Sequence, residues 1–240
     1  MANEGGEWIM HGLAWDDPYR IRTPEELIAY IDQVGFLPLF ANEVPGFSAE
    51  EHVSDLFWWT GDPEQDPWVW REILARSGRV AYGKFFHRKA GFVSKAWFPA
   101  FANYRRDGYD FDARWDDELA SFREKKIADL FEENAELYSF EIRKKAGFGK
   151  EGEKNFEGVL TDLQMKAYLI LRDFRCRRRK DGEEYGWPIA VYTTPERWIG
   201  PEAIEEGYRE KPADSARRIF ERIREEYPWA EEEQIRKVMK

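Results

Sequence analysis

The chain has 240 residues, which is long enough to bury a sizeable core in one large domain or two small ones. Its formal net charge of -10 argues against a protein covered in positive charge, and its 16% aromatic content excludes disorder over most of its length. Charge is unevenly distributed: residues 1–60 contain two basic and eleven acidic residues, whereas residues 141–180 contain twelve basic and six acidic ones. A local basic surface is therefore compatible with the acidic total.

The cysteine count and the lack of long apolar segments limit which cellular compartment and which cofactors are expected. The single Cys176 cannot form an internal disulfide, and a cysteine-based zinc site needs more thiols. The first residues lack the basic and apolar regions of a signal peptide, and no stretch approaches the length of a membrane-spanning helix. The three histidines are scattered, and no nucleotide-binding motif occurs. We therefore expect a cytoplasmic protein with no membrane association, no metal and no cofactor.

The first half of the chain reads as helices followed by a hairpin. Residues 1–21 look like an irregular leader. Three helices are then expected, each begun by a capping signal: residues 24–34, 48–57 and 67–77. After Gly78 the apolar period changes from helical to alternating, which predicts a β-hairpin with a turn near residues 88–91. Together, residues 22–112 are predicted to form a winged-helix-like unit.

The second half repeats this order. A long amphipathic helix is expected from Trp115 to Phe131, then a short helix capped by Ser139 and a third over residues 153–165. A hairpin follows over residues 168–192 and completes a winged-helix unit spanning residues 113–200. Residues 201–240 read as a C-terminal helical extension. The predicted fold class is α+β and mostly helical, with tandem winged-helix units and closing C-terminal helices.

The hairpin contains the most basic stretch of the chain, RCRRRKDGEEYG at residues 175–186. If Asp181-Gly182 forms a two-residue turn, Lys180 pairs with Glu183, Arg179 with Glu184 and Arg178 with Tyr185, which places Arg178 at the rim of the buried side. One face then carries apolar side chains, and arginines occupy the other. The predicted apolar face comprises Phe174, Cys176, Tyr185, Trp187, Ile189 and Val191; the basic face comprises Arg175, Arg177 and Arg179. Because glutamates oppose two of the basic residues, free charge is expected mainly on Arg175 and Arg177.

These arginines are candidates for contact with a nucleic-acid backbone. The predicted phosphate contacts are Arg175, Arg177 and Arg179, extended by Lys150, Lys154 and Lys166 near the preceding helix. The alternative is an ordinary solvated edge strand, on which charged side chains prevent aggregation.

A second candidate is a cleft built from polar tips among aromatic residues. Aromatic rings could stack on a base, arginines could bind phosphate, and carboxylates could accept hydrogen bonds from amino groups. The alternative is an internal network of paired arginines and aspartates. The predicted cleft residues are Tyr82, Lys84, Tyr104, Arg105, Asp107, Tyr109, Asp110 and Asp112. The tryptophan-rich segment 56–70 is expected to be core rather than a ligand cage.

Several segments carry a family resemblance: GFLPLFANEVPGFSAEEHV, WWTGDPEQDPWVWR, VAYGKFFHRKAGFVSKAWFPAFANYRRDGYDFDAR and LTDLQMKAYLILRDFRCR. They cover most of residues 35–200. The chain resembles the AlkZ-related proteins, which are relatives of the AlkZ/YcaQ winged-helix DNA glycosylases. The resemblance implies tandem winged-helix units and duplex DNA as the partner, and it leaves any protein partner unknown.

The resemblance also exposes a departure from the glycosylases. Their catalytic Gln-x-Asp or Gln-x-Gln motif falls on residues 35–40, where Pro38 and Phe40 replace the two polar residues. Neither side chain can orient water or transfer a proton. We therefore expect nucleic-acid binding without enzymatic activity. Two alternatives stay open: a divergent glycosylase or base-processing hydrolase that uses Asp107, Asp110 or Asp112, and a protein-interaction module.

Overall fold

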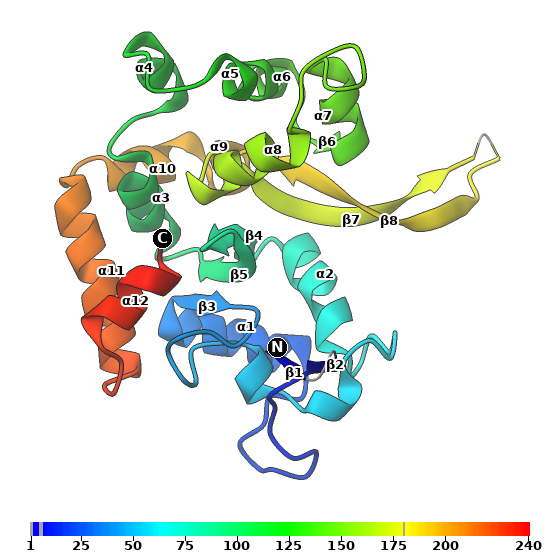
Figure 1. The fold of residues 1–240 in the computed structure, drawn as a ribbon, viewed down its shortest axis with the longest axis vertical. Helices are drawn as coiled ribbons and strands as arrows, with labels where there is room; N and C mark the ends of the chain where they lie inside the picture. The colour runs from blue at the N-terminus through cyan, green and yellow to red at the C-terminus, as the bar shows by residue number, and fades with distance from the viewer. Residues whose placement is uncertain (1, 5–6, 180) are drawn as a thin grey trace. The chain divides into compact units, whose positions relative to one another are not determined.

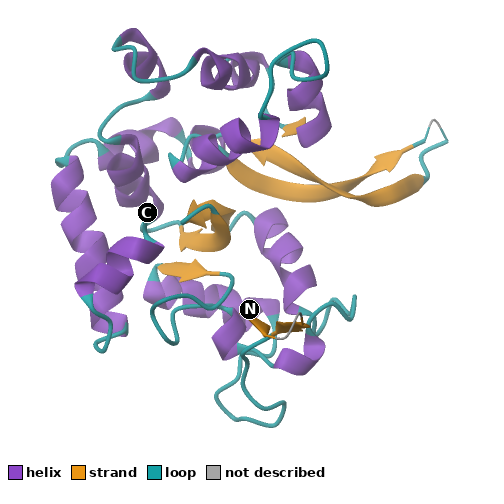
Figure 2. Cartoon of the chain, in the orientation of Figure 1, coloured by secondary structure: helices purple, strands orange, loops and turns teal. Residues whose placement is uncertain are grey.

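The computed structural model describes residues 2–4, 7–179 and 181–240. The chain divides into two compact units: residues 1–98 with 216–240, and residues 99–215. Residues 201–240, expected as one extension, are thus shared between the two units. The fold is α+β, and helices make up most of its regular structure (Figure 2). None of the described helices combines the length and the apolar composition needed to cross a bilayer.

The first unit contains a three-stranded antiparallel arrangement in the order β3-β5-β4, with helices around it (Figure 1). Its elements are β1 (Ala2–Glu4), β2 (Glu7–Ile9), α1 (Pro24–Val34), β3 (Phe36–Pro38), the 3-10 turns η1 (Glu50–His52) and η2 (Asp55–Phe57), α2 (Pro67–Ser77), β4 (Val80–Phe86), β5 (Lys89–Ser94), most of α11 (Pro212–Glu226), and α12 (Glu232–Val238).

Two of the three helices predicted in this unit are confirmed, with the capping that the sequence suggested. The side chain of Thr23 accepts a hydrogen bond from the Glu26 amide at the start of α1, which ends at Gly35 with φ at 89°. Asp66 caps α2 by accepting a hydrogen bond from the Trp68 amide. Local capping signals therefore set both helices.

The helix predicted over residues 48–57 is wrong, because two 3-10 turns replace it. Val53 adopts an extended conformation that ends the first turn, and Ser54 caps the second. The buried carboxylate of Glu50 accepts hydrogen bonds from the amides of His11 (2.8 Å) and Ala41 (2.9 Å). These tertiary hydrogen bonds favour an irregular segment over a continuous helix.

The hairpin predicted after Gly78 is confirmed as β4 and β5. Its turn consists of His87 and Arg88, with φ of 47° and 64°, and Phe86 pairs with Lys89. Positive φ at both central residues is the mark of a type I′ turn, which suits the twist of a hairpin. The turn thus begins one residue before the predicted position.

The second unit is a set of short helices with a long hairpin. In Figure 1, β7 and β8 form a twisted ribbon that extends beyond the helices of this unit. β8 pairs antiparallel with both β7 and β6. The elements are α3 (Phe98–Arg106), α4 (Phe111–Asp116), α5 (Phe122–Ala128), α6 (Leu130–Glu133), β6 (Leu137–Tyr138), α7 (Ser139–Lys145), α8 (Phe156–Met165), β7 (Ile170–Arg178), β8 (Glu184–Thr193), α9 (Pro195–Ile199) and α10 (Pro201–Gly207).

The long helix predicted from Trp115 to Phe131 is wrong, because it is broken into α4, α5 and α6. Glu118 has a φ of 59°, which a helix interior does not allow. A capping box between Ser121 and Glu124 then starts a new helix. The two following helices and the hairpin are confirmed as α7, α8 and β7–β8, but Tyr138 and not Ser139 occupies the N-cap position of α7.

Both units repeat one order of elements. A helix, a short strand, two helical segments and a hairpin follow one another in each unit: α1, β3, η1–η2, α2 and β4–β5, then α5–α6, β6, α7, α8 and β7–β8. In each, the short strand pairs with the last strand of the hairpin. The sequence predicted the repeated order of helices and hairpin. The structure adds the short strand in each unit and its pairing with the hairpin.

Candidate functional site

The β7–β8 hairpin differs from its predicted register. Arg178 pairs with Glu184 and Arg177 with Tyr185, and the Arg179 amide donates to the Glu183 carbonyl (2.8 Å). The predicted pairs of Arg179 with Glu184 and Arg178 with Tyr185 are therefore wrong, and Lys180 lies outside the described residues. The Gly182 amide donates to the Arg179 carbonyl (3.0 Å), so the turn differs from the predicted two-residue turn. Gly182, with φ at 90°, lies in the left-handed region that favours glycine.

A second irregularity lies further along the hairpin. One residue of β7, Cys176, separates the pair Arg175–Ile189 from the pair Arg177–Tyr185, but three residues separate them on β8. Two causes are visible on β8. Gly186 has a φ of 77°, and Pro188 has no N–H to donate to the ladder. The extra residues form a bulge, which shifts the side chains of this stretch out of simple alternation.

The bulge overturns part of the predicted apolar face. Trp187 is 86% exposed and Tyr185 is 41% exposed, whereas Val191, nearer the helices, is buried. We call residues 176–179 and 181–188 the hairpin arm. Almost every described residue of the arm is exposed. The arm therefore exposes aromatic rings together with arginines, whereas the predicted register placed the rings and the arginines on opposite faces.

The arginines of the hairpin differ in their partners. Arg175 pairs with Asp173 (2.6 Å) and Glu136 (2.7 Å), so the prediction that it carries free charge is wrong. Burial alone would lower its pKa, but these two carboxylates raise the pKa above its ordinary value.

The remaining arginines belong to the exposed arm. The guanidinium of Arg177 lies 4.7 Å from the ring centre of Phe140, and no ion pair of Arg177 occurs within the described residues. Arg178 pairs with Glu184 (3.0 Å), and Arg179 pairs with Glu183 (3.3 Å) and lies over the ring of Tyr185. Arg178 was expected at the buried rim, but it is exposed because of the changed register.

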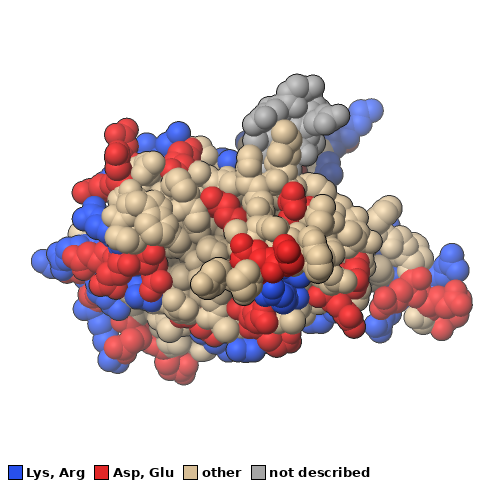
Figure 3. Space-filling view, turned by 90° about the horizontal axis from the view of Figure 1, so that it is seen from below, with Lys and Arg blue, Asp and Glu red and all other residues tan. Residues whose placement is uncertain are grey.

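Two of the three lysines predicted to extend the basic face have partners of their own. Lys166 pairs with Glu124, and the Lys154 ammonium donates to the carbonyls of Gly149 and Lys150 within its own loop. The side chain of Lys150 is exposed. On the face shown in Figure 3, basic and acidic side chains are interspersed rather than separated into a broad basic area.

The predicted cleft residues fall in both units. Tyr82 and Lys84 belong to the first unit, where Tyr82 is buried against Phe92 and burial raises its pKa. In the second unit, Arg105 lies over the rings of Phe101 and Tyr104, and burial lowers the pKa of Arg105 to about 10. Arg105 is thus covered by aromatic rings of its own helix, and these contacts involve no aspartate.

Of the other cleft candidates, Asp107, Tyr109 and Asp110 lie in the loop between α3 and α4, and Asp112 lies in α4. Asp107 is exposed and has a φ of 54°. The carbonyl of Tyr109 accepts hydrogen bonds from the hydroxyls of Tyr168 (2.9 Å) and Tyr208 (3.3 Å). Asp110 caps α4 through the Ala113 amide. Of the predicted cleft residues, only Asp110 and Asp112 line the pocket described next.

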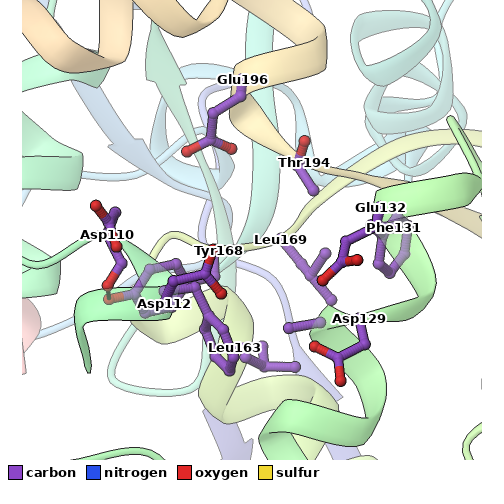
Figure 4. A pocket seen from close by; sticks show the side chains of 12 residues that line it. Asp110, Asp112, Asp129, Phe131, Glu132, Leu163, Tyr168, Leu169, Thr194 and Glu196 are labelled. Atoms are coloured by element: carbon purple, nitrogen blue, oxygen red, sulfur yellow. Dashed lines mark hydrogen bonds between the residues drawn. The ribbon is translucent and has the colours of Figure 1, made fainter. Parts of the chain in front are cut away.

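The second unit contains a pocket of about 310 Å³ (Figure 4). Apolar and aromatic side chains form much of its wall, and five carboxylates lie around it. The lining residues are Asp110, Phe111, Asp112, Ala128, Asp129, Phe131, Glu132, Leu163, Tyr168, Leu169, Thr194 and Glu196. Most of these lining residues could not be predicted from the sequence. No sequence pattern indicated the helix break at residues 117–121 or that α9 lies beside the same cavity.

The pocket carboxylates differ in how they are neutralised. Glu196 pairs with the buried Arg106 (2.6 Å), and Asp129 pairs with Lys125 (2.5 Å). The carboxylate of Asp112 forms a longer pair with the ammonium of the same lysine, at 3.9 Å. Within the part of the chain that the structure describes, the side chain of Glu132 has no ion-pair partner. The pocket therefore keeps an excess of negative charge on its lining.

The residues at the glycosylase motif positions lie in an apolar setting. Pro38 is buried in β3, and the ring of Phe40 packs near those of Trp58 (5.7 Å) and Trp68 (6.4 Å). Trp58 is buried as expected for core, whereas Trp59 is 50% exposed. Phe40 thus contributes to an aromatic cluster and offers no group for proton transfer.

Among the described residues, no group of three or more histidine, cysteine, aspartate or glutamate side chains is arranged to hold a metal ion.

Comparison with known proteins adds one result. The model of the family described as AlkZ related matches residues 21–240, which is most of the chain. No curated protein and no solved structure matches it. The match agrees with the segments in which the sequence resembles this group. The chain belongs to the AlkZ-related family.

Proposed function

We propose that this protein binds duplex DNA through the hairpin arm and does so without glycosylase chemistry. The observation that carries the proposal is the arm itself, on which the exposed Trp187 accompanies Arg177, Arg178 and Arg179. Arginines bind phosphate, and an exposed aromatic ring can stack on a base or insert beside one. Membership of a family related to DNA glycosylases supports nucleic acid as the partner.

The charge pairs on the arm do not prevent such binding. The pairs Arg178–Glu184 and Arg179–Glu183 are solvent-exposed on both sides. Exposed pairs of this kind are worth about 0–1 kcal/mol, so a phosphate can displace the glutamate at small cost. Arg177 needs no such exchange, because its guanidinium is stacked on Phe140. Arg175 is assigned to holding the base of the hairpin rather than to phosphate.

The repeated order of elements supports a winged-helix organisation, in which the hairpin is the wing. In many such proteins the third helix enters the major groove. Here that helix would be α8, which has no basic residue and exposes Glu157. An acidic helix is repelled by phosphates, so we assign DNA contact to the wing.

The absence of glycosylase chemistry rests on the motif positions. Pro38 and Phe40 provide neither a base nor a hydrogen-bond donor, and the nearest aromatic neighbours of Phe40 are tryptophans. Cleavage of a glycosidic bond requires a polar group that activates water or stabilises the developing positive charge. We therefore assign the protein a role in DNA binding and not in glycosidic-bond cleavage.

Trp187 provides the first test. In fluorescence-anisotropy titrations at low salt, the wild-type protein is expected to bind a labelled duplex. Trp187→Ala is expected to weaken binding about tenfold, because base stacking contributes about 1–3 kcal/mol per aromatic ring. The fold should be unaffected, since the ring is 86% exposed.

Trp15→Ala is the matched control, because Trp15 is also exposed (61%) but lies outside the arm. It should bind as the wild type does. The proposal fails if the wild-type protein shows no binding, or if both tryptophan variants bind equally well.

A further inference from the structure

The hairpin arm combines an exposed indole ring with side chains whose charges largely cancel. We infer from this combination that the arm selects DNA duplexes that contain unpaired bases, and that Trp187 makes the selection by stacking on such a base. The inference rests on the proposed function and deepens it, since it names the class of duplex that the arm prefers. An intact duplex, whose bases are already stacked on one another, is then the weaker ligand.

The charge of the arm gives little preference among duplexes. Its described residues include three arginines, and against them stand three carboxylates: Asp181, Glu183 and Glu184. Arg178 and Arg179 each pair with one of these glutamates. Arginine contacts to phosphate carry no information about base pairing, because every duplex presents the same charged backbone. Selection therefore has to come from a side chain that contacts bases.

Three aromatic rings lie on or beside the arm, and Trp187 differs from the other two. Phe140 is covered by the guanidinium of Arg177 (4.7 Å), and Tyr185 by that of Arg179 (5.6 Å). Trp187 is 86% exposed, and within the described residues its side chain makes no hydrogen bond and no ring contact. An indole ring with open faces is the kind of group on which a base stacks.

The backbone holds Trp187 in this exposed position. It lies at the centre of the bulge, between Gly186, which has a φ of 77°, and Pro188. A proline restricts the residue before it to extended conformations, so the main chain at Trp187 has little freedom to lose on binding. A tryptophan side chain also has few rotatable bonds, which keeps its own loss of entropy small. The ring is therefore preorganised to stack on a base.

An unpaired base is the partner that uses this ring at the lowest cost. To stack within an intact duplex, the indole must first separate two stacked base pairs, which costs free energy. Where bases are unpaired, as in a bulge, much of that separation is already made. Because stacking on one aromatic ring strengthens binding by about tenfold or more, the cost of separation decides which duplex binds best.

Fluorescence-anisotropy titrations of the full chain with three matched duplexes test the selection. The first duplex is fully paired, and the second carries a bulge of unpaired thymidines. The third carries a bulge of the same length with abasic sites in place of the thymidines. The second should bind about tenfold more tightly than the first. The third should bind within about threefold of the first, because it has the phosphates of a bulge but no bases to stack.

Two variants assign the selection to the indole ring. Trp187→Ala should bind the bulged and the paired duplex within about threefold of each other, because the stacking ring is lost. Trp187→Phe, which keeps an aromatic ring, should keep most of the preference. Trp15→Ala is the matched control, since it removes an exposed indole outside the arm, and it should keep the full preference.

The inference is overturned if the paired and the bulged duplex bind the wild type equally well, if the abasic bulge binds as tightly as the bulge with bases, or if Trp187→Ala keeps the preference. In each of these results the protein still binds DNA, so the proposed function stands. A wild-type protein that binds none of the three duplexes overturns the proposed function and the inference with it.

Discussion

Replacing Arg106 with methionine is expected to lower the free energy of unfolding by about 3 kcal/mol or more. Arg106 is 1% exposed and is one of the largest fully buried side chains. Its guanidinium donates to the Ala167 carbonyl (2.7 and 3.2 Å), to Glu196 (2.6 Å) and to the Tyr208 hydroxyl (2.8 Å). It also lies over the ring of Tyr168, 4.6 Å from its centre.

The size of this effect follows from what the substitution leaves behind. Methionine preserves much of the volume but no donor, so the buried Ala167 carbonyl loses both hydrogen bonds. An unsatisfied buried polar group costs about 1–3 kcal/mol. The partly buried Glu196 loses its counter-charge as well. Burial alone would lower the pKa of Arg106, but Glu196 and Tyr208 raise it, so the residue is charged when it makes these contacts.

Urea denaturation followed by circular dichroism measures this loss. Arg209→Met is the matched control, because Arg209 pairs with Glu206 on the surface and both side chains are exposed. The control should change the free energy of unfolding by no more than about 1 kcal/mol. Equal stability of the two variants would mean that Arg106 does not organise α3, α9 and α10 as described.

Reversing the charge of two arm arginines is expected to weaken duplex binding by about 30-fold or more. The variant combines Arg177→Glu with Arg178→Glu. Each change removes a phosphate partner and adds a negative charge that repels the backbone. Both residues are exposed, so the fold should persist.

The matched control carries the same charge change on another surface of the second unit. It combines Arg209→Glu with Lys211→Glu, both at exposed positions outside the arm. The control should bind within about threefold of the wild type, because only distant, screened repulsion is added. Equal losses in the two double variants would assign the effect to net charge and not to the arm.

The elements that local signals set could be predicted from the sequence. α1 and α2 follow from the caps at Thr23 and Asp66, and the β4–β5 hairpin follows from the alternating pattern after Gly78. Segments that tertiary contacts decide could not be predicted. The hydrogen bonds of buried Glu50 and the positive φ of Glu118 have no local signature, yet they accompany the loss of two predicted helices.

The candidate sites were predicted less completely. Counting from a two-residue turn at Asp181-Gly182 misplaced the hairpin register, and the bulge around Trp187 could not be foreseen because it depends on Gly186 and Pro188 together. In the pocket, Asp110 and Asp112 were among the candidates. Glu132 and Glu196 were not, since no sequence spacing links residues that come together only in the folded unit.

The salt dependence of duplex binding tests the phosphate contacts of the arm most directly. The logarithm of the association constant, measured against the logarithm of the salt concentration, has a slope of about -0.9 per phosphate contact on duplex DNA. Replacing Arg177 and Arg178 with alanine should make the slope of the wild type shallower by about two. A double variant with the wild-type slope, or a wild-type protein that does not bind, would contradict the account.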